Sequence, residues 1–541
     1  MSHSNRLRTR LSLQQPSGFW TNGFAYDLVK RLTNVTSQAG SFGYLYDPAL
    51  FTHHASRVAL PNTSYITNVF DSNVRLLATY LRKSDNTVFD SYAYVYNPAN
   101  QRTNLARADT STVGYKYDRV GRLTVADSSV STEDTGYTYD AGWNLHYRTN
   151  FGGLNTYSVD SKNQLSSSPG GSPSYDANSN LTALGDGTFD TAGYDDENRL
   201  IWAQVEGFWR SEFTYDGMGR LRQRSDFDWD DTWKLSEQVN YIYDGWRVIQ
   251  ERDSNNVPAV SYTRGNDFSG TMEGAGGIGG MLARSFYSLG GPFHDFYFAD
   301  GNGNITCMLD SSQNIVASYR YDPFGNTISL SGLLAGANTY RFSSKELMGN
   351  SGLYYYGYRF YDPNLQRWVN RDPIEERGGL NLYRFAANAP INKVDSLGLD
   401  PYWGFSTETC CCNGKKVKNM AIKSGLKRCT GKANTVDTDH GWLEMDDGWS
   451  ADFVAAGSIW WGHGVVSSPT DYVKHSDKQC DDVWIFPCSI DKDKFLKAVK
   501  ERVAANMKKP PNYNWLLYNC FEWDNAVIND ALRDSAGCTA K

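Results

Sequence analysis

Long hydrophobic runs are missing from this chain of 541 residues. No stretch of about 18 apolar residues is available to span a bilayer, and the basic N-terminal segment MSHSNRLRTRLSLQQ is not followed by the apolar core of a signal peptide. The net charge of −7 also lacks the clustered excess of Lys and Arg that neutralises phosphates. We therefore expect no stable membrane insertion, no nucleic acid as a general partner, and export by another route.

Cysteine is almost missing from the first 400 residues, where Cys307 stands alone. The other eight are Cys410, Cys411, Cys412, Cys429, Cys480, Cys488, Cys520 and Cys538. So dense a group predicts a disulfide framework, a metal site or a reactive thiol. Without a Cys-x-x-Cys pair at zinc spacing the disulfide and metal alternatives stay open, and we assign neither a metal nor a cofactor. The shift in composition predicts a domain boundary near residue 400.

Length and composition favour several folding units with a mainly β structure. A chain of 541 residues exceeds what one hydrophobic core usually supports. Its 35 Tyr, 16 Trp and 49 Gly favour short strands and turns over long helices.

A short pattern built on Tyr-Asp recurs before residue 340. The unit reads aromatic-x-Tyr-Asp-x-x-Gly/Asn-Arg/Asn-Leu, and its clearest copies are Tyr115-Lys-Tyr-Asp118 with Gly121-Arg-Leu123, Tyr137-Thr-Tyr-Asp140 with Asn144-Leu145, Tyr194-Asp195 with Asn198-Arg-Leu200, and Tyr215-Asp216 with Gly219-Arg-Leu221. Related copies occur at Tyr26-Asp27, Tyr46-Asp47, Tyr175-Asp176, Tyr243-Asp244 and Tyr321-Asp322. A period of roughly 16–28 residues predicts a stacked or spiralling array.

Each repeat unit is predicted to form a small hairpin. Aromatic residues at alternate positions put two rings on one face of a strand, and the Asp-x-x-Gly/Asn segment supplies a turn that tolerates positive φ. Because a lone hairpin is marginal in water, consecutive units must pair edge to edge into a long sheet. The Tyr and Asp residues of the units are interpreted as structural, and none is a catalytic candidate.

Residues 339–399 carry the most specific pattern of the chain. Its parts are Tyr340-Arg-Phe, Gly352-Leu-Tyr-Tyr-Tyr-Gly-Tyr-Arg-Phe-Tyr-Asp362, Arg367-Trp368, Arg371-Asp-Pro373, Gly378-Gly-Leu-Asn-Leu-Tyr-Arg-Phe385, Asn388-Ala-Pro390 and Asp395-Ser-Leu-Gly-Leu399. These motifs follow the order of the RHS repeat-associated core, and the repeats resemble the YD repeats of RHS and Tc-toxin C proteins. The resemblance implies a β-hairpin sheet winding into a shell over residues 1–399, with repeats at 1–338, a plug at 339–399 and a C-terminal effector domain at 400–541.

The resemblance also implies aspartyl self-cleavage by the core. Carried over to this chain, Asp372 and Asp395 are the paired carboxylates, Arg371 is their charge partner and Leu399-Asp400 is the scissile bond. Two close carboxylates that share a proton can supply a general acid and a general base from one site. The alternative is an uncut plug in which both aspartates only cap turns.

The core departs from the family pattern in three places. Glu375-Glu376 replace the usual Gly-Leu, Ala389 stands where a second Asn is common, and Ser396 replaces Pro. We expect Ser396 to affect cleavage most directly, because it loosens the backbone beside Asp395.

Beyond residue 399 the pattern changes to that of a small α+β domain. We expect strands at residues 440–445, 459–466 and 483–486. Apolar residues at helical spacing predict a helix over 493–503 and a second one through 523–531.

This domain resembles circularly permuted papain-like (NlpC-type) thiol hydrolases, which include relatives of lecithin retinol acyltransferase. The features are Tyr-Asn-Cys520 before a helix and the upstream strand that begins at His440. A helix N-terminus lowers the pKa of a thiol, and an imidazole takes its proton. Cys520 is then the nucleophile, His440 the base, and His463, or as second choice Glu444, the orienting residue. In the alternative, Cys520 is a buried, inert cysteine.

The function that these observations predict is that of an RHS polymorphic-toxin-like protein of bacterial origin, secreted or delivered at the cell surface. Its shell encloses its own C-terminal domain, a cysteine hydrolase or acyltransferase, and its other partners are an immunity protein and components of a secretion system. About 400 residues are expected to be too few for a full cage. The rival hypotheses are a non-enzymatic adhesion or carbohydrate-binding repeat protein and a nuclease-type toxin.

Overall fold

The structure is a computed structural model that describes residues 7–399 apart from positions 17, 51, 152, 187 and 289–290. Beyond residue 399 it describes the backbone of strands at 403–404, 422–433, 439–445, 450–456, 462–467, 475–485 and 512–513. The chain divides into two compact units, Met1–Thr407 and Glu408–Lys541. The part of the chain that is described contains no helix that is long and apolar enough to cross a membrane.

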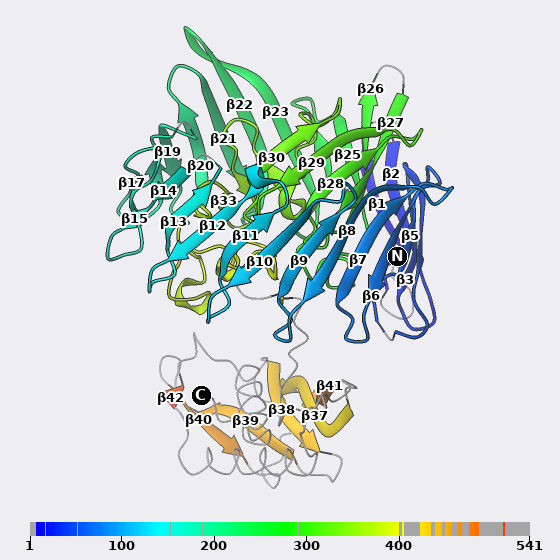
Figure 1. The fold of residues 1–541 in the computed structure, drawn as a ribbon. Helices are drawn as coiled ribbons and strands as arrows, with labels where there is room; N and C mark the ends of the chain where they lie inside the picture. The colour runs from blue at the N-terminus through cyan, green and yellow to red at the C-terminus, as the bar shows by residue number, and fades with distance from the viewer. Residues whose placement is uncertain are drawn as a thin grey trace. The chain divides into compact units, whose positions relative to one another are not determined.

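Two long antiparallel sheets make up most of the first unit (Figure 1). The first sheet contains β1 (Arg10–Gln15), β2 (Gly18–Tyr26), β3 (Leu32–Ser37), β4 (Gly40–Leu45), β5 (Arg57–Ala59), β6 (Tyr65–Phe70), β7 (Leu76–Arg82), β8 (Val88–Tyr96), β9 (Arg102–Arg107), β10 (Thr112–Tyr117), β11 (Leu123–Ser128), β12 (Thr135–Tyr139), β13 (Leu145–Asn150) and β14 (Gly153–Thr156). A short 3-10 helix, η1 (Ser131–Glu133), lies between β11 and β12. Each strand pairs with the next along the chain, so the predicted edge-to-edge array of hairpins is confirmed.

The second sheet has the same sequential order. It contains β19 (Thr191–Tyr194), β20 (Leu200–Val205), β21 (Trp209–Tyr215), β22 (Leu221–Asp230), β23 (Thr232–Asp244), β24 (Arg247–Arg252), β25 (Pro258–Arg264), β26 (Met281–Ser288), β27 (Gly291–Ala299), β28 (Ile305–Leu309), β29 (Ile315–Tyr321) and β30 (Thr327–Ser331). Two small hairpins stand between the sheets, made by β15 (Ser158–Val159) with β16 (Leu165–Ser167) and β17 (Ser174–Tyr175) with β18 (Leu181–Ala183). The mainly β fold class is therefore confirmed.

The aspartate of a repeat unit closes the turn between two strands. In the unit between β10 and β11, Asp118 Oδ1 accepts hydrogen bonds from the backbone N–H groups of Val120 and Arg122 at 3.0 and 2.9 Å. Asp118 Oδ2 accepts a third bond from Arg122 Nε at 2.6 Å. The intervening Gly121 has a φ of +88°, as the turn requires. These contacts show why the motif needs Asp, Gly and Arg at this spacing.

The tyrosine and arginine of a unit connect it to its neighbours. The Tyr117 hydroxyl donates to the Arg102 carbonyl of the preceding strand pair, and the Tyr215 hydroxyl donates to that of Leu200. In the other direction, the Arg122 guanidinium lies over the ring of Tyr139 in the next unit, at 5.0 Å from its centroid. The structural interpretation of these residues fits the observed contacts.

Val74 occupies the turn position that glycine holds in other units. Its φ is +62°, a strained conformation for a β-branched residue. We expect Val74→Asn to raise the free energy of unfolding by about 1 kcal/mol, because Asn tolerates this conformation. The reverse exchange at Gly121, Gly121→Val, should lower it, since a Cβ there lies 3.3 Å from Gln101 Nε2. Urea unfolding midpoints measure both, and equal midpoints for Val74→Asn and the wild type would contradict the expectation.

The core segment, residues 339–399, packs between the faces of the two sheets. It contains the strands β31 (Glu346–Leu347), β32 (Tyr354–Tyr355), β33 (Phe360–Asp362), β34 (Arg367–Trp368) and β35 (Lys393–Val394), and the 3-10 helices η2 (Phe342–Ser344), η3 (Glu375–Arg377) and η4 (Ala386–Asn388). Tyr354 and Tyr361 join the hydrophobic cluster that holds most of the buried residues of the first sheet, together with residues of β26–β28 from the second sheet. Tyr355 and Phe360 join the cluster around β20–β25. Figure 1 shows this segment, in yellow-green, inside the curve of the sheets.

The second unit contributes a six-stranded sheet. Its order is β41 (His475–Ile485), β37 (Ile422–Ala433), β38 (Asp439–Met445), β39 (Ser450–Ala456), β40 (Gly462–Ser467) and β42 (Asn512–Tyr513). The strand expected at 440–445 is confirmed by β38. The strand expected at 459–466 runs from 462 to 467, and the one expected at 483–486 is the end of the longer β41. The helices expected at 493–503 and 523–531 lie outside the described residues.

Candidate active site

Two buried aspartates of the core segment approach one arginine. Asp372 follows β34 and Asp395 follows β35, and their exposed fractions are 5% and 3%. Arg359 Nη2 lies 2.8 Å from Asp372 Oδ2 and 3.7 Å from Asp395 Oδ2. Asp372 and Asp395, the predicted pair of carboxylates, therefore both lie close to Nη2 of Arg359.

The charge partner of these carboxylates differs from the one expected. Arg371, which was expected in this role, is exposed, and Arg359 occupies the position instead. The guanidinium of Arg359 lies over the ring of Trp368, at 4.3 Å from its centroid, and its Nη1 donates to the Leu382 carbonyl at 3.1 Å. These contacts fix the plane of the guanidinium, whereas the side chain next to Asp372 in sequence points to solvent because the chain turns there.

Asp395 holds the backbone that leads to the expected scissile bond. Its Oδ1 accepts hydrogen bonds from the N–H groups of Leu397, Gly398 and Leu399 at 3.2, 2.7 and 3.1 Å. We call residues 396–399 the strap. Asp395 thus caps a turn, as the alternative of an uncut plug requires, and the same bonds bring the strap next to the aspartate pair.

The carbonyl groups of the first three residues of the strap each accept a hydrogen bond from a different donor. Lys345 Nζ donates to the Ser396 carbonyl at 2.6 Å, the backbone N–H of Tyr358 donates to the Leu397 carbonyl at 3.0 Å, and Arg359 Nε donates to the Gly398 carbonyl. The flexibility expected from Ser396 is offset by these bonds. The next carbonyl along the chain is that of Leu399, and Asp400 lies outside the described residues.

The environment of Asp372 favours its protonated form. Burial raises the pKa of Asp372, and the positive charge of Arg359 opposes this shift only in part. The negative charge of Asp395 adds to the rise. Asp372 therefore holds a proton more readily than a free aspartate does, as a general acid requires.

Sequence reasoning missed Arg359 and Lys345. Arg359 belongs to the conspicuous Tyr-Arg-Phe part of the core motif, which is a signal that could have identified it. Lys345 gave no signal, because it reaches the Ser396 carbonyl from 51 positions away in the sequence.

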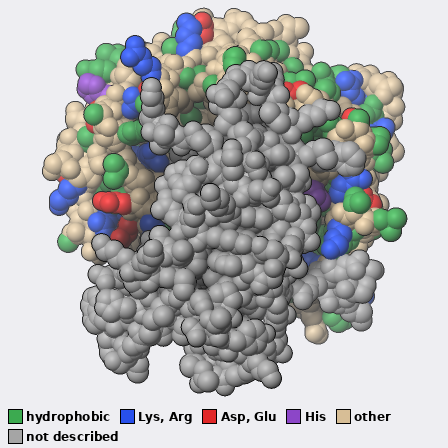
Figure 2. All heavy atoms as spheres, turned by 90° about the horizontal axis from the view of Figure 1, so that it is seen from below, with side chains coloured by type: hydrophobic (Ala, Val, Ile, Leu, Met, Phe, Trp, Pro, Cys, Tyr) green, Lys and Arg blue, Asp and Glu red, His purple; other side chains and the backbone are tan. Residues whose placement is uncertain are grey.

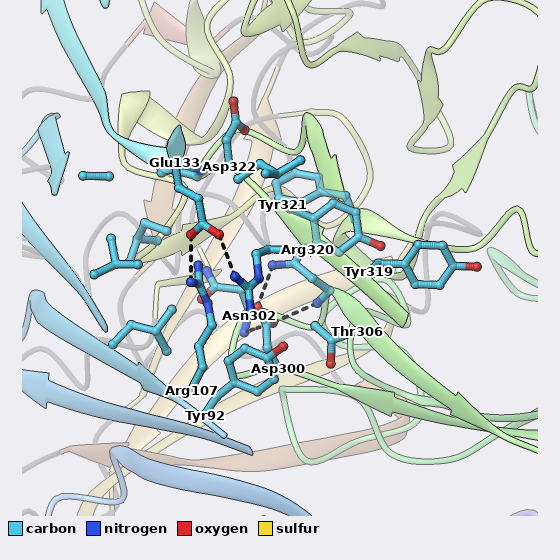
Figure 3. Close-up of a pocket in the computed structure, with 18 of the residues that line it drawn as sticks. Tyr92, Arg107, Glu133, Asp300, Asn302, Thr306, Tyr319, Arg320, Tyr321 and Asp322 are labelled. Atoms are coloured by element: carbon cyan, nitrogen blue, oxygen red, sulfur yellow. Dashed lines mark hydrogen bonds and ion pairs between the residues drawn. The ribbon is translucent and has the colours of Figure 1, made fainter. Parts of the chain in front are cut away.

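A second polar site joins the two sheets at a cavity of about 50 Å³ (Figure 3). Glu133 Oε2 accepts a hydrogen bond from Arg107 Nη1 at 2.8 Å, and Glu133 Oε1 accepts one from Arg320 Nη1 at 2.6 Å. Arg320 also pairs with Asp109. Since Arg107 ends β9 and Arg320 belongs to β29, these charges act as a brace between the sheets.

Because of this brace, we expect the folded protein to lose stability in acid. Burial raises the pKa of Glu133, but the hydrogen bonds and charges of Arg320 and Arg107 outweigh it and hold the pKa below its ordinary value. Stability from this carboxylate is therefore present above its unfolded pKa and is lost as pH falls through the lower folded pKa. We expect Glu133→Gln to reduce the free energy of unfolding by about 3 kcal/mol at pH 7 and by less at pH 3.

Urea unfolding at the two pH values measures this difference. Glu212→Gln is the matched control, because Glu212 pairs with Arg210 at a more exposed position. Equal losses for Glu133→Gln and Glu212→Gln would exclude the brace.

The expected effector residues are only partly placed. His440 lies on β38 and His463 on β40, with β39 paired between these strands. Glu444 also lies on β38, and Cys520 lies outside the described residues. The backbone register sets Cys429 of β37 opposite Cys480 of β41, so the disulfide alternative has one pair at adjacent positions.

No family model matches the chain. It is 27% identical to double-stranded DNA deaminase toxin A of Burkholderia cenocepacia over 242 residues, which cover 41% of this chain and 17% of the relative. It is 27% identical to tRNA nuclease WapA of Bacillus subtilis over 313 residues, covering 56% of this chain and 12% of the relative, and 36% identical to toxin subunit YenC2 of Yersinia entomophaga over 105 residues, covering 18% and 11%. The chain thus spans less than a fifth of the length of each.

Solved structures match the fold of about three quarters of this chain. The crystal structure of TcdB2-TccC3 matches with a TM-score of 0.56 at 19% identity and covers 74% of this chain and 24% of that chain. The same complex without its hypervariable C-terminal region matches with a TM-score of 0.57 at 17% identity, covering 74% and 23%. The match therefore does not depend on that region. The expected fold of the repeat region is confirmed.

Proposed function

We propose that this chain is the shell and effector part of an RHS-type toxin, and that its core segment cuts the chain after Leu399. The observation that carries the proposal is the pair Asp372 and Asp395 on Arg359, with the strap held beside them by Asp395 itself. Support also comes from toxins among the relatives and from the shell fold.

The proposed reaction is hydrolysis of the Leu399-Asp400 peptide bond. The Asp395 carboxylate takes a proton from a water molecule, whose oxygen attacks the Leu399 carbonyl carbon. Asp372 donates its proton to the Asp400 nitrogen as the C–N bond breaks. The products are a new carboxyl group at Leu399 and a new amino group at Asp400, with Arg359 holding the two carboxylates in place throughout.

For the effector we propose a thiol hydrolase or acyltransferase with Cys520 as nucleophile, His440 as base and His463 as the orienting residue. The backbone register supports the two histidines. Trp442 pairs with Asp452, and Asp452 pairs with Ser467, so these three positions share a face of the sheet. His440 lies two positions from Trp442 on β38, and His463 lies four positions from Ser467 on β40. The two histidine positions therefore occupy one face of the sheet.

The proposed partners are a cognate immunity protein and components of a secretion system, and the proposed setting is delivery outside the producing bacterium.

A second candidate function is a toxin that acts on nucleic acid. The names of two relatives, a DNA deaminase toxin and a tRNA nuclease, favour it. In the face of the molecule shown in Figure 2, the Lys and Arg side chains of the described residues are scattered among acidic and hydrophobic ones. An effector that acts on nucleic acid would need its own basic surface in the second unit.

Expression of residues 400–541 in bacteria separates these candidates. If the thiol enzyme is correct, growth arrests with the wild-type segment and resumes with Cys520→Ala, while Cys538→Ala remains toxic. Arrest by all three segments, accompanied by loss of intact tRNA or by mutation of DNA, favours the toxin that acts on nucleic acid. Normal growth with the soluble wild-type segment favours the adhesion hypothesis.

A further inference from the structure

A small cavity in the first unit collects positive charge. It has a volume of about 40 Å³ and lies between the second sheet and the core segment. Arg247 of β24, Arg264 at the end of β25 and Lys345 of the core segment line it, with exposed fractions of 4%, 5% and 7%. Buried cations need a counter-charge or hydrogen-bond acceptors, because their transfer from water is costly.

Arg247 is only partly satisfied. Its Nη2 pairs with Asp244 Oδ2 at 2.5 Å. Its Nε and Nη1 are buried, and among the residues that the structure describes they have no hydrogen-bond partner. Donors of this kind in a native protein usually indicate an acceptor that is not part of the chain, such as a water molecule or an ion.

The three cations also repel one another. Burial and the charge of Arg264 together lower the pKa of Lys345 to about 7, against the opposing charges of Asp395, Asp267 and Glu273. Burial likewise lowers the pKa of Arg247, against the opposing charges of Asp244 and Glu273, and the charge of Arg264 adds to the decrease. A negative charge among the three would relieve this repulsion.

The carboxylates near the cavity are hydrogen-bonded elsewhere. Asp244 binds Arg8 in a bidentate pair, at 2.6 and 2.7 Å, as well as Arg247. Glu346 accepts hydrogen bonds from Arg224 Nη1 at 3.0 Å and from the Tyr241 hydroxyl at 2.7 Å, and burial raises its pKa to about 8. Glu346 is therefore held by Arg224 and Tyr241 rather than by Arg247.

Glu273, Asp267 and Asp395 are further carboxylates close to these cations. Glu273 accepts a hydrogen bond from the backbone N–H of Trp246. Asp267 accepts hydrogen bonds from the backbone N–H groups of Ala275 and Gly277 at 2.7 and 3.0 Å, and Asp395 accepts those of the strap. Arg247 thus keeps two donors without a partner among the described residues, and the cavity that it lines can hold a few water molecules or one small ion.

We propose that this cavity binds a small inorganic anion of the size of chloride, held by Arg247, Arg264 and Lys345. Lys345 Nζ uses two of its three donors on the Gly276 and Ser396 carbonyls, at 3.1 and 2.6 Å, and the third is available to the anion. The anion thus joins the second sheet to the strap. This site does not depend on whether the chain cuts itself.

Thermal unfolding of the full-length chain tests the site, with bromide as the probe. Sodium bromide is titrated against sodium gluconate at constant ionic strength, since gluconate is too bulky for the cavity. We expect bromide to raise the Tm saturably by about 3–5 °C. Arg247→Met should abolish this rise, whereas Arg210→Met, which removes an arginine from a more exposed ion pair with Glu212, should retain it.

A crystal structure of the wild type in bromide gives an independent result when Arg247→Met fails to fold. An anomalous bromide peak within hydrogen-bond distance of Arg247 Nη1 and Nε is expected. Water density at that position, or the same bromide dependence of Tm in Arg247→Met and the wild type, overturns the proposal. Because neither measurement uses the cleavage products, its failure is distinguishable from a failure of self-cleavage.

Discussion

The purified Asp395→Asn chain is expected to run as one species of 60.7 kDa, whereas the wild type separates into residues 1–399 and 400–541. Asparagine keeps the Oδ1 acceptor that binds the N–H groups of the strap, so the local fold should persist. It cannot take a proton from water as a carboxylate does, and loss of a general base typically slows a reaction by at least 10²-fold. Intact-mass spectrometry under denaturing conditions measures the outcome.

Asp322→Asn is the matched control for this change. Asp322 is a half-buried aspartate that also caps a turn, with Phe324 and Asn326 as its backbone partners, but it belongs to a repeat unit. We expect Asp322→Asn to cleave like the wild type. Fragments from Asp395→Asn in the same yield as from the wild type would remove Asp395 from the mechanism, and an uncut wild type would support the plug that only caps turns.

Gly276→Ala is expected to stop cleavage from the opposite side of the strap. A Cβ at this position would lie 2.1 Å from the Ser396 carbonyl oxygen, and the φ of Gly276 is +62°. Lys345 Nζ donates one hydrogen bond to the Gly276 carbonyl and another to the Ser396 carbonyl, so Gly276 and the strap are held close together. An added methyl group must therefore push the strap away from the aspartates, and a displacement of about 1 Å at a reacting bond can cost 10²-fold in rate.

Gly336→Ala is the control for the glycine experiment, because a Cβ there has no atom within 4 Å among the described residues. A time course of the intact mass after synthesis compares the two variants with the wild type. We expect cleavage of Gly336→Ala at the wild-type rate and at most one hundredth of that rate for Gly276→Ala. Equal rates for both would mean that the strap adjusts to the methyl group and that its position is not critical.

The repeat units were predictable from sequence because each is a local structure. The turn of a unit depends on contacts within four residues, such as those of Asp118 with Val120 and Arg122, and a short motif records such contacts completely. The sequential order of the strands followed because each hairpin leaves an edge for the next.

The site was predictable only in part, because its contacts join distant segments. The resemblance to the RHS repeat-associated core brought Asp372 and Asp395 into one hypothesis, but it also implied Arg371 as their charge partner, where the fold supplies Arg359. Lys345 and Gly276 reach the strap from other parts of the chain, and a motif around the strap cannot record them. The absence of a hydrogen-bond acceptor for Nε and Nη1 of Arg247 among the described residues is visible only in the three-dimensional structure.

The contacts between neighbouring units have a consequence for how such a shell can change in size. The Tyr hydroxyls of several units reach back by one strand pair, as Tyr117 does to Arg102 and Tyr215 does to Leu200, and an Arg such as Arg122 reaches forward by one to the ring of Tyr139. Because both bonds span a single step, a whole hairpin can be inserted or removed and every remaining unit still meets a neighbour of the same kind. Loss of a single strand would reverse the direction of every following strand and remove the Tyr hydrogen bond and the Arg–ring contact at that point. We therefore expect the sheet to lengthen or shorten only by complete hairpins.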